Sequence, residues 1–380
     1  MMKDKLLYIE GIRGVACFMV VLSHLALVFY PGLHEHDLII HGWERVIYDS
    51  PLPFFYSGTA AVYIFFVLSG YVLTFGIMKN KDILASISMM TIRRYFRLAP
   101  PVVASCILAY VALNFIGSDT SALSAWAQSY GKFEPTFFGA IYSGLVETFF
   151  RGGSNYNPVL WTMKIELIGS FIVFYYCAVS SKVNRKFVVA LLFSLCISLL
   201  PISQIEKYSY LCFIFGAYIS GVDIRLPLKM ALPFLIVGAY FGGVHYGSSA
   251  YSMVIGFVSF SVLGEMINAY YLFCAFSGVL VVMSIISNES LSRLFSGKIV
   301  VYSGKVSFSV YLIHMPIIYL ISPFIFNSFL NELGYFYASL TSSFLTVFVI
   351  YMASNAFYKA FDFQSIKLSK AAFTSMRPIV

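Results

Sequence analysis

The feature that most limits how this chain can fold is a succession of long apolar stretches that carry almost no charge. Of its 380 residues, 59% are hydrophobic and only 11% are charged, whereas an average soluble domain carries about 25% charge. About twenty apolar residues are enough to cross a bilayer as a helix. The strict polar and apolar alternation of membrane-barrel strands is not visible. The sequence therefore predicts an all-α, polytopic integral membrane protein, a bundle of transmembrane helices.

Windows of about twenty residues place about ten transmembrane helices in the sequence. The predicted spans are 8–30, 54–77, 98–116, 159–179, 187–202, 208–222, 230–245, 267–287, 302–322 and 333–354. Further apolar segments lie at 83–92, 137–150 and 251–263. Residues 1–354 are predicted to form one membrane domain, and 355–380 a short, basic cytoplasmic tail.

Basic residues are unevenly divided between the two sets of connections that join the spans. One set carries the run from Arg93 to Arg97, clusters near Lys182, Arg225 and Lys298, and the basic tail, whereas the other carries only Arg45, Lys132, Arg151 and Lys207. Because cytoplasmic loops are enriched in Lys and Arg, we predict that both termini are cytoplasmic and that loops 31–53 and 117–158 face outward. This distribution accounts for the net charge of +8 without a nucleic-acid partner.

Ionisable residues inside the predicted spans are candidates for function, because they are costly at membrane depth. Arg13 and His24 lie eleven residues apart in the first span, which puts them on one helix face about 16 Å apart. Glu166 and His314, on two other spans, are predicted to reach a depth similar to that of His24. Either histidine alone could simply join two helices by a hydrogen bond. A carboxylate beside imidazoles fits a general base or a proton relay, so enzymatic and transport functions both stay open.

The arginine run on the predicted cytoplasmic side has a simple and a functional interpretation. Arg93, Arg94 and Arg97 lie three or four residues apart within Thr91–Pro101, so pairs of them share one helix face. Such a run can be only a membrane anchor. Clustered guanidiniums with aromatic neighbours also suit a phosphorylated, planar ligand such as a nucleotide-containing acyl donor. Histidines 34, 36 and 41 with Glu35 lie in an outer loop, where their spacing fixes no geometry, and no metal site is expected.

Five short segments, in a fixed order, carry a resemblance to a known family. They are Glu10–Gly14 with His24 eleven residues after Arg13, then Phe65–Tyr71, Arg93–Pro100, Trp161–Glu166 and Tyr311–Pro316. In this order and at these places in the topology, the sequence resembles the membrane acyltransferase-3 family over residues 8–320. Glu10 stands where the commonest family opening has Asp. We expect the stand-alone form, without the soluble hydrolase-like domain that larger members append.

The resemblance implies transfer of an acyl group, most often acetyl, from cytoplasmic acyl-coenzyme A to a hydroxyl outside the membrane barrier. Family members acetylate lipopolysaccharide O-antigens, exopolysaccharides and other surface glycans, which implies an inner (plasma) membrane location. No permanently bound cofactor is expected, since acyl-coenzyme A is a donor substrate. The expected partners are this donor, a glycan or lipid-linked glycan, and membrane lipids.

Residue roles follow from the matching positions. His24 resembles the catalytic base, and Glu166 and His314 are assigned to the same catalytic group. Arg13 and the arginines 93, 94 and 97 resemble donor-side residues for coenzyme A phosphates, while Tyr71 and Trp161 are assigned to substrate binding. The alternative is a transporter or flippase of lipid-linked sugars. It is disfavoured because no inverted repeat is visible and the arginine run lies on one side only.

Overall fold

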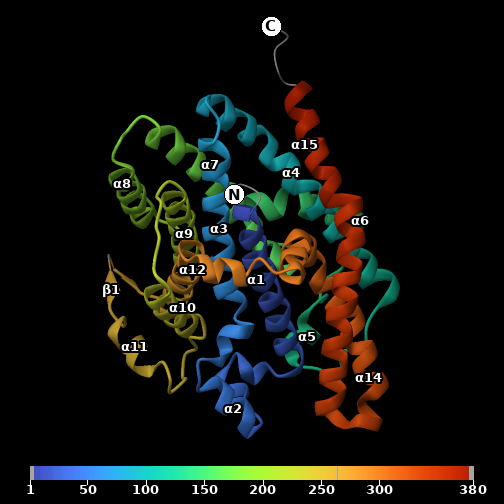
Figure 1. The fold of residues 1–380 in the computed structure, drawn as a ribbon. Helices are drawn as coiled ribbons and strands as arrows, with labels where there is room; N and C mark the ends of the chain where they lie inside the picture. Colours follow the sequence, from blue (N-terminus) through green and yellow to red (C-terminus); the bar gives the residue numbers. More distant parts are fainter. Residues whose placement is uncertain (1–3, 263, 376–380) are drawn as a thin grey trace. The chain divides into compact units, whose positions relative to one another are not determined.

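The computed structural model describes residues 4–262 and 264–375, and within these the chain is helical almost throughout (Figure 1). The longer helices are α1 (Asp4–Phe29), α3 (Gly58–Met78), α4 (Ile83–Val111), α7 (Thr162–Ser180), α8 (Lys186–Leu199), α9 (Gln204–Ser220), α10 (Leu228–Gly242), α12 (Ala269–Ser287), α14 (Lys298–Phe357) and α15 (Phe363–Ser375). The prediction of an all-α membrane fold is confirmed at this level.

Short elements join these helices. The short α-helices are α2 (Gly42–Tyr48), α5 (Ala125–Ser129), α6 (Phe137–Tyr142), α11 (Ser252–Phe257) and α13 (Glu289–Leu294). Tighter 3-10 turns are η1 (Pro31–Leu33), η2 (His36–Leu38), η3 (Leu52–Tyr56) and η6 (Pro158–Trp161), and π-helical turns are η4 (Ala112–Ile116), η5 (Ser143–Arg151) and η7 (Tyr358–Asp362). Strands β1 (Ser261–Val262) and β2 (Glu265–Met266) form an antiparallel hairpin.

Each of the ten predicted spans overlaps a helix, but the helices differ in their capacity to cross a membrane. Among the described residues, six helical stretches are long and apolar enough to do so. Helices α8 and α10 are apolar but shorter, and α9 has 17 residues. The count of ten crossings and the cytoplasmic placement of both termini stay predictions. The apolar segment 83–92 is the first part of α4, not a separate piece.

Helix α14 is a hairpin of two helices that meet at Gly334. This glycine has φ 71°, a left-handed conformation that costs little without a Cβ. Across the break the Ser342 hydroxyl donates to the Ser322 carbonyl at 2.8 Å, and the Ser322 hydroxyl bonds that of Thr346 at 3.0 Å. The predicted connection 323–332 is therefore helical, because the two arms turn at one residue and need no loop.

The segment after residue 354 continues as helix. It comprises the end of α14, the π-helical turn η7 and α15 up to Ser375. Side chains of this segment are buried, including Asp362 and Ser365. Residues 376–380 of the predicted tail lie outside the described residues. The stretch 355–371 is thus packed as part of the fold, and its assignment to the cytoplasmic side stays a prediction.

The chain divides into two compact units, each made of several segments. The first unit comprises the chain up to Leu22, Gly32–Thr91 and Ile168–Lys305. The second comprises Ser23–Pro31, Ile92–Leu167 and the chain from Val306 onward. In the first unit α3 packs closely on α9, because a side chain at Gly70 or Gly216 would collide with the facing backbone.

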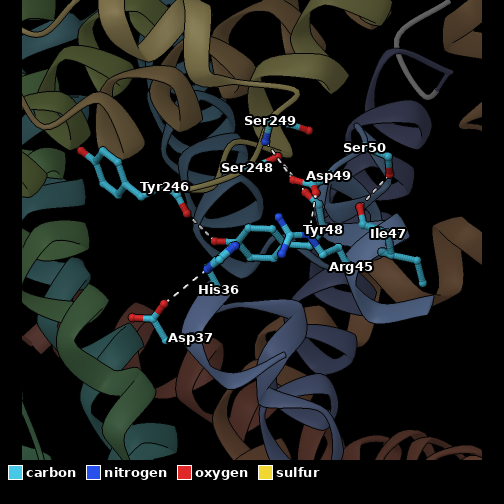
Figure 2. Close-up of polar contacts among 10 residues, drawn as sticks. All are labelled: His36, Asp37, Arg45, Ile47, Tyr48, Asp49, Ser50, Tyr246, Ser248 and Ser249. Carbon is cyan, nitrogen blue, oxygen red and sulfur yellow. Dashed lines mark hydrogen bonds and ion pairs between the residues drawn. The ribbon is translucent and has the colours of Figure 1, made fainter. Parts of the chain in front are cut away.

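Polar contacts fasten the segments around α2 in the first unit (Figure 2). The Tyr48 hydroxyl at the end of α2 donates to the Tyr246 carbonyl, and the Ser248 hydroxyl donates back to the Tyr48 carbonyl at 2.9 Å. The Asp49 carboxylate accepts from the Ser249 backbone N–H at 2.8 Å and pairs with Arg45 at 3.3 Å. The first of these bonds holds the pKa of Asp49 below its usual value. These contacts join α2 to the loop that follows α10.

Candidate active site

Two of the predicted catalytic residues meet directly in the second unit. His24, in the last turns of α1, and His314, in the first arm of α14, are 290 positions apart in the chain. Nδ1 of His24 lies 3.2 Å from Nε2 of His314, and the ring centroids are 5.0 Å apart. His314 is fully buried, and His24 is partly exposed. The two imidazoles, which the sequence predicted to reach a similar depth, are therefore direct neighbours.

The contacts of His314 fix the proton positions on both rings. Nδ1 of His314 lies 2.8 Å from the carbonyl of Tyr311 and 3.1 Å from that of Val310. Carbonyl oxygens only accept, so this nitrogen carries the proton. In neutral His314, Nε2 is then the acceptor, and Nδ1 of His24 must donate to it. Nε2 of His24 is left as the basic nitrogen, which is the tautomer a general base needs.

An aromatic side chain that the sequence interpretation missed covers His24. Trp126 stacks on the His24 ring with centroids 5.7 Å apart and an angle of 29° between the planes. The tryptophan belongs to α5, in the loop predicted to face outward. Ser124 caps this helix and fastens it to the end of α1, because its hydroxyl donates to the Leu27 carbonyl at 2.7 Å. The signal for this contact in the sequence was a tryptophan within the loop 117–158, which was predicted to face outward.

A cavity of about 290 Å³ lies next to this stack. Trp126 and Met315, which contact or directly follow the two histidines, form part of its wall. The rest of the lining mixes aromatic and polar side chains, among them Tyr130, Phe133, Lys132 and Asn155. Such a mixture is typical of small-molecule sites, whose volumes begin at about 300 Å³.

The start of α7 is joined to α14 next to His314. Buried Asn157 donates from its amide nitrogen to the Leu312 carbonyl at 2.7 Å. The Tyr311 hydroxyl donates to the Val159 carbonyl at 2.6 Å and lies 2.8 Å from the Thr162 hydroxyl. Trp161, predicted to bind substrate, ends the turn η6 at this junction. Asn157 was not singled out from the sequence, because its partner lies 155 positions away.

Glu166 and the predicted donor-side arginines also belong to the second unit. Glu166, which we expected beside an imidazole, forms an ion pair with Arg94 in which each side chain is 16% exposed. Arg97 forms an ion pair with Asp362, a residue that the sequence interpretation left in the tail. Arg93 lies on the same helix, with its Nε buried. These contacts leave the predicted roles of the four residues untested.

The remaining predicted site residues lie in the first unit. Arg13 is paired with Glu10, one turn before it on α1, at 3.7 Å, and about a third of each side chain is exposed. Tyr71, on α3, is buried and shares a side-chain hydrogen bond with Tyr8. Arg13 and His24 do share one unbroken helix, as predicted. Donor contact by Arg13 and substrate contact by Tyr71 stay predictions.

Comparison with known proteins settles the family. The sequence profile described as an acyltransferase domain (Acyl_transf_3) matches residues 6–354. The chain belongs to the acyltransferase-3 family. It is also similar to the O-acetyltransferase PaAT-1 of Phomopsis amygdali, with 24% identity over 431 residues that cover 96% of this chain and 84% of that protein. No solved structure matches it significantly. The family resemblance is thus confirmed, and the match supports membrane O-acyltransferase activity.

Proposed function

We propose that this acyltransferase-3 protein moves an acetyl group from acyl-coenzyme A to a hydroxyl of a cell-surface or lipid-linked carbohydrate. The acceptor class would include O-antigen and exopolysaccharide. Support comes from the family match over residues 6–354 and from the similarity to a named O-acetyltransferase. The proposal includes an inner-membrane location, ten crossings, and both termini in the cytoplasm with the donor. It also includes no permanently bound cofactor.

The paired imidazoles are the observation on which the chemistry rests. The His314 ring, held through Nδ1 by backbone carbonyls, orients His24 so that Nε2 of His24 is basic. This nitrogen takes the proton from the acceptor hydroxyl as the oxygen attacks the thioester carbonyl. The new C–O bond forms, the C–S bond breaks, and the proton passes from His24 to the departing thiolate of coenzyme A. Water is not consumed, and the net change is ester for thioester.

The cavity beside the histidines is the proposed acceptor site. Trp126 and Phe133 offer flat apolar faces to a sugar ring, and Lys132, Ser154 and Asn155 offer polar groups to its hydroxyls. Its volume of about 290 Å³ is at the lower limit for a ligand pocket, which suits one sugar residue better than an entire coenzyme A. Trp161 and Tyr71 are retained as proposed substrate contacts, and Glu166 as a residue that supports the catalytic group.

The donor would enter from the side that carries the arginines. Arg13 and the arginines 93, 94 and 97 supply the positive charge that coenzyme A phosphates need. The family relation says nothing about which arginine contacts the donor, and the transporter alternative needs no acyl donor at all. The dependence on acyl-coenzyme A is therefore the point at which the two functions separate.

The test is transfer by the purified full-length protein from radiolabelled acetyl-coenzyme A to surface glycan extracted from the native host. We expect label in the glycan and a loss of about 10²- to 10⁴-fold in His24→Ala. The control is His36→Ala, a partly exposed histidine of the first outer loop, which should keep full activity. Glycan binding without any turnover of acetyl-coenzyme A would support the transporter and overturn the enzyme. Unchanged surface acetylation after gene deletion would reject the glycan acceptor.

A further inference from the structure

A small apolar slot in the second unit lies one helical turn beyond the two histidines. Val28 follows His24 by four residues on α1. In the same way, Ile318 follows His314 by four residues on α14. Residues at this spacing share a helix face and lie about 6 Å apart along the axis. Val28 and Ile318 both line the slot, together with Leu123 from the loop before α5. The slot is therefore the next layer after the imidazole pair.

The slot is small and almost wholly apolar. Its volume of about 20 Å³ is little more than one water molecule needs, and a methyl group has a similar size. The side chains of Val28, Leu123 and Ile318 are each at most 6% exposed. The hydroxyl of Tyr130, another lining residue, already donates to the Tyr156 carbonyl at 2.6 Å. A sugar would leave hydroxyls unpaired in such a space, and a lipid chain exceeds its volume many times. The slot thus suits one small apolar group.

The loop wall of the slot is fastened to α1 by the backbone. The Ser124 N–H donates to the Val28 carbonyl at 3.2 Å, next to the side chain of Val28 that lines the slot. Ser124 also directly follows Leu123, so this bond fixes the position of Leu123 against α1. Two of the lining residues are therefore held together by one main-chain contact.

The α14 wall is held although a proline interrupts its hydrogen bonds. Pro316 has no N–H to donate to the Leu312 carbonyl, four residues before it. The amide nitrogen of buried Asn157 donates to this carbonyl instead, at 2.7 Å. The arm that carries Ile318 is thereby tied to the start of α7. An apolar pocket with fixed walls discriminates between groups that differ by one methylene.

The slot adjoins the proposed acceptor cavity. Trp126, Tyr130 and Met315 line both spaces, and Trp126 also stacks on His24. An acceptor hydroxyl in the cavity and a small apolar group in the slot would therefore meet next to the proposed base.

We propose that the apolar slot receives the methyl of the acetyl group and limits the length of the acyl chain that the protein transfers. This assignment rests on the proposed transfer from acyl-coenzyme A. The carbonyl carbon under attack must lie beside His24, and its methyl is one bond of about 1.5 Å farther. A slot one turn from the imidazoles is in reach of that methyl. A longer chain would collide with Val28, Leu123 and Ile318, which are the specificity-determining residues.

The test compares acetyl-, propionyl- and butyryl-coenzyme A as donors for the purified full-length protein and the native glycan. In the wild type, kcat/KM should fall about 10- to 200-fold for the first added methylene. Ile318→Ala enlarges the slot, so it should raise kcat/KM for butyryl relative to acetyl by about 10-fold or more. Ile318→Val removes a single methyl and should shift the preference toward propionyl. This milder variant decides the question if the alanine variant does not fold.

The matched control is Ile317→Ala. Ile317 is also buried in α14 but lies about 100° around the helix from Ile318, so its loss should lower the unfolding temperature in detergent and leave the donor preference unchanged. The proposal is overturned if the wild type uses all three donors equally, or if Ile318→Ala and Ile317→Ala change the preference alike. In either case acetyl transfer itself would still stand. Turnover of none of the three donors would instead refute the proposed acyl transfer, and the role of the slot with it.

Discussion

His245 in the first unit and His314 in the second are anchored in the same way. Each is buried, and each donates from Nδ1 to a backbone carbonyl, that of Gly243 at 2.9 Å for His245 and that of Tyr311 at 2.8 Å for His314. The difference is at Nε2. In the part of the chain that the structure describes, Nε2 of His245 has no hydrogen-bond partner, and the ring packs against Tyr48. Nε2 of His314 faces His24.

The comparison teaches that burial and tautomer do not make a histidine functional. Both rings are held with the same nitrogen protonated. Of the two, His314 contacts a second imidazole, that of His24, next to a cavity. His245 instead belongs to the loop after α10, and its ring packs against that of Tyr48 at the end of α2. We therefore assign His314 to the reaction and His245 to the stability of the first unit. The following substitutions test this assignment.

The largest effect is expected for His314→Ala. Without its Nε2 acceptor, His24 loses the partner that keeps the proton on Nδ1, so Nε2 is basic for only part of the time. We expect kcat to fall about 10²-fold, with a smaller change in KM for acetyl-coenzyme A. Steady-state kinetics on purified protein provide the measurement. Full kcat in His314→Ala would remove this histidine from the mechanism.

A smaller effect is expected for Trp126→Ala. The stack on His24 and the cavity wall are both lost, so KM for the glycan acceptor should rise about 3- to 10-fold, the range of an aromatic contact. Trp126→Phe should keep most of the affinity. Trp43→Ala, in helix α2 of the first unit, is the matched control. An equal rise in KM in both tryptophan variants would show that the effect is not specific to the histidine pair.

His245→Ala should have the opposite profile to His314→Ala. Removing the buried ring leaves a cavity and an unmet Gly243 carbonyl, which should lower the free energy of unfolding by about 2 kcal/mol. The value of kcat should stay within twofold. Thermal unfolding in detergent tests the expected loss of stability, and the acetyl-transfer assay on the same preparation tests the expected kcat. A large loss of kcat in a folded variant would erase the distinction between the two histidines.

The smallest effect is a pH dependence of stability. Burial lowers the pKa of His245 below its ordinary value. As the pH falls, the unfolded chain therefore binds a proton at this residue more readily than the folded protein does. Stability should therefore fall as pH drops below about 6.5, by at most about 1.4 kcal/mol per pH unit for one group. His245→Asn can keep the bond to Gly243 but does not titrate. Its unfolding temperature should fall less between pH 7 and pH 5 than that of wild type. Equal slopes would mean that His245 does not titrate on unfolding.

The sequence predicted well what depends on local pattern. Apolar length placed the helices, and counting residues along them placed His24 and His314 at one depth. It could not supply the partners of these residues, since the contacts of Asn157 with Leu312 and of Arg97 with Asp362 join positions 155 and 265 apart. The ion pair of Glu166 with Arg94 was not foreseen for the same reason, because a carboxylate at the right depth can turn to a guanidinium as readily as to an imidazole. The role of Trp126 could not be predicted either, because its contact with His24 depends on how α5 packs against α1.

The glycine at position 334 decides how the last third of this protein can enter a bilayer. A continuous helix of 60 residues would be about 90 Å long, which is three times the thickness of the hydrocarbon core. The reversal at Gly334 folds that length into two arms that satisfy each other's serine and threonine hydroxyls. These hydroxyls are thereby hydrogen-bonded within the protein, as the interior of a bilayer requires of polar groups. One residue without a side chain thus lets the arm that carries His314 pack against the arm that follows it.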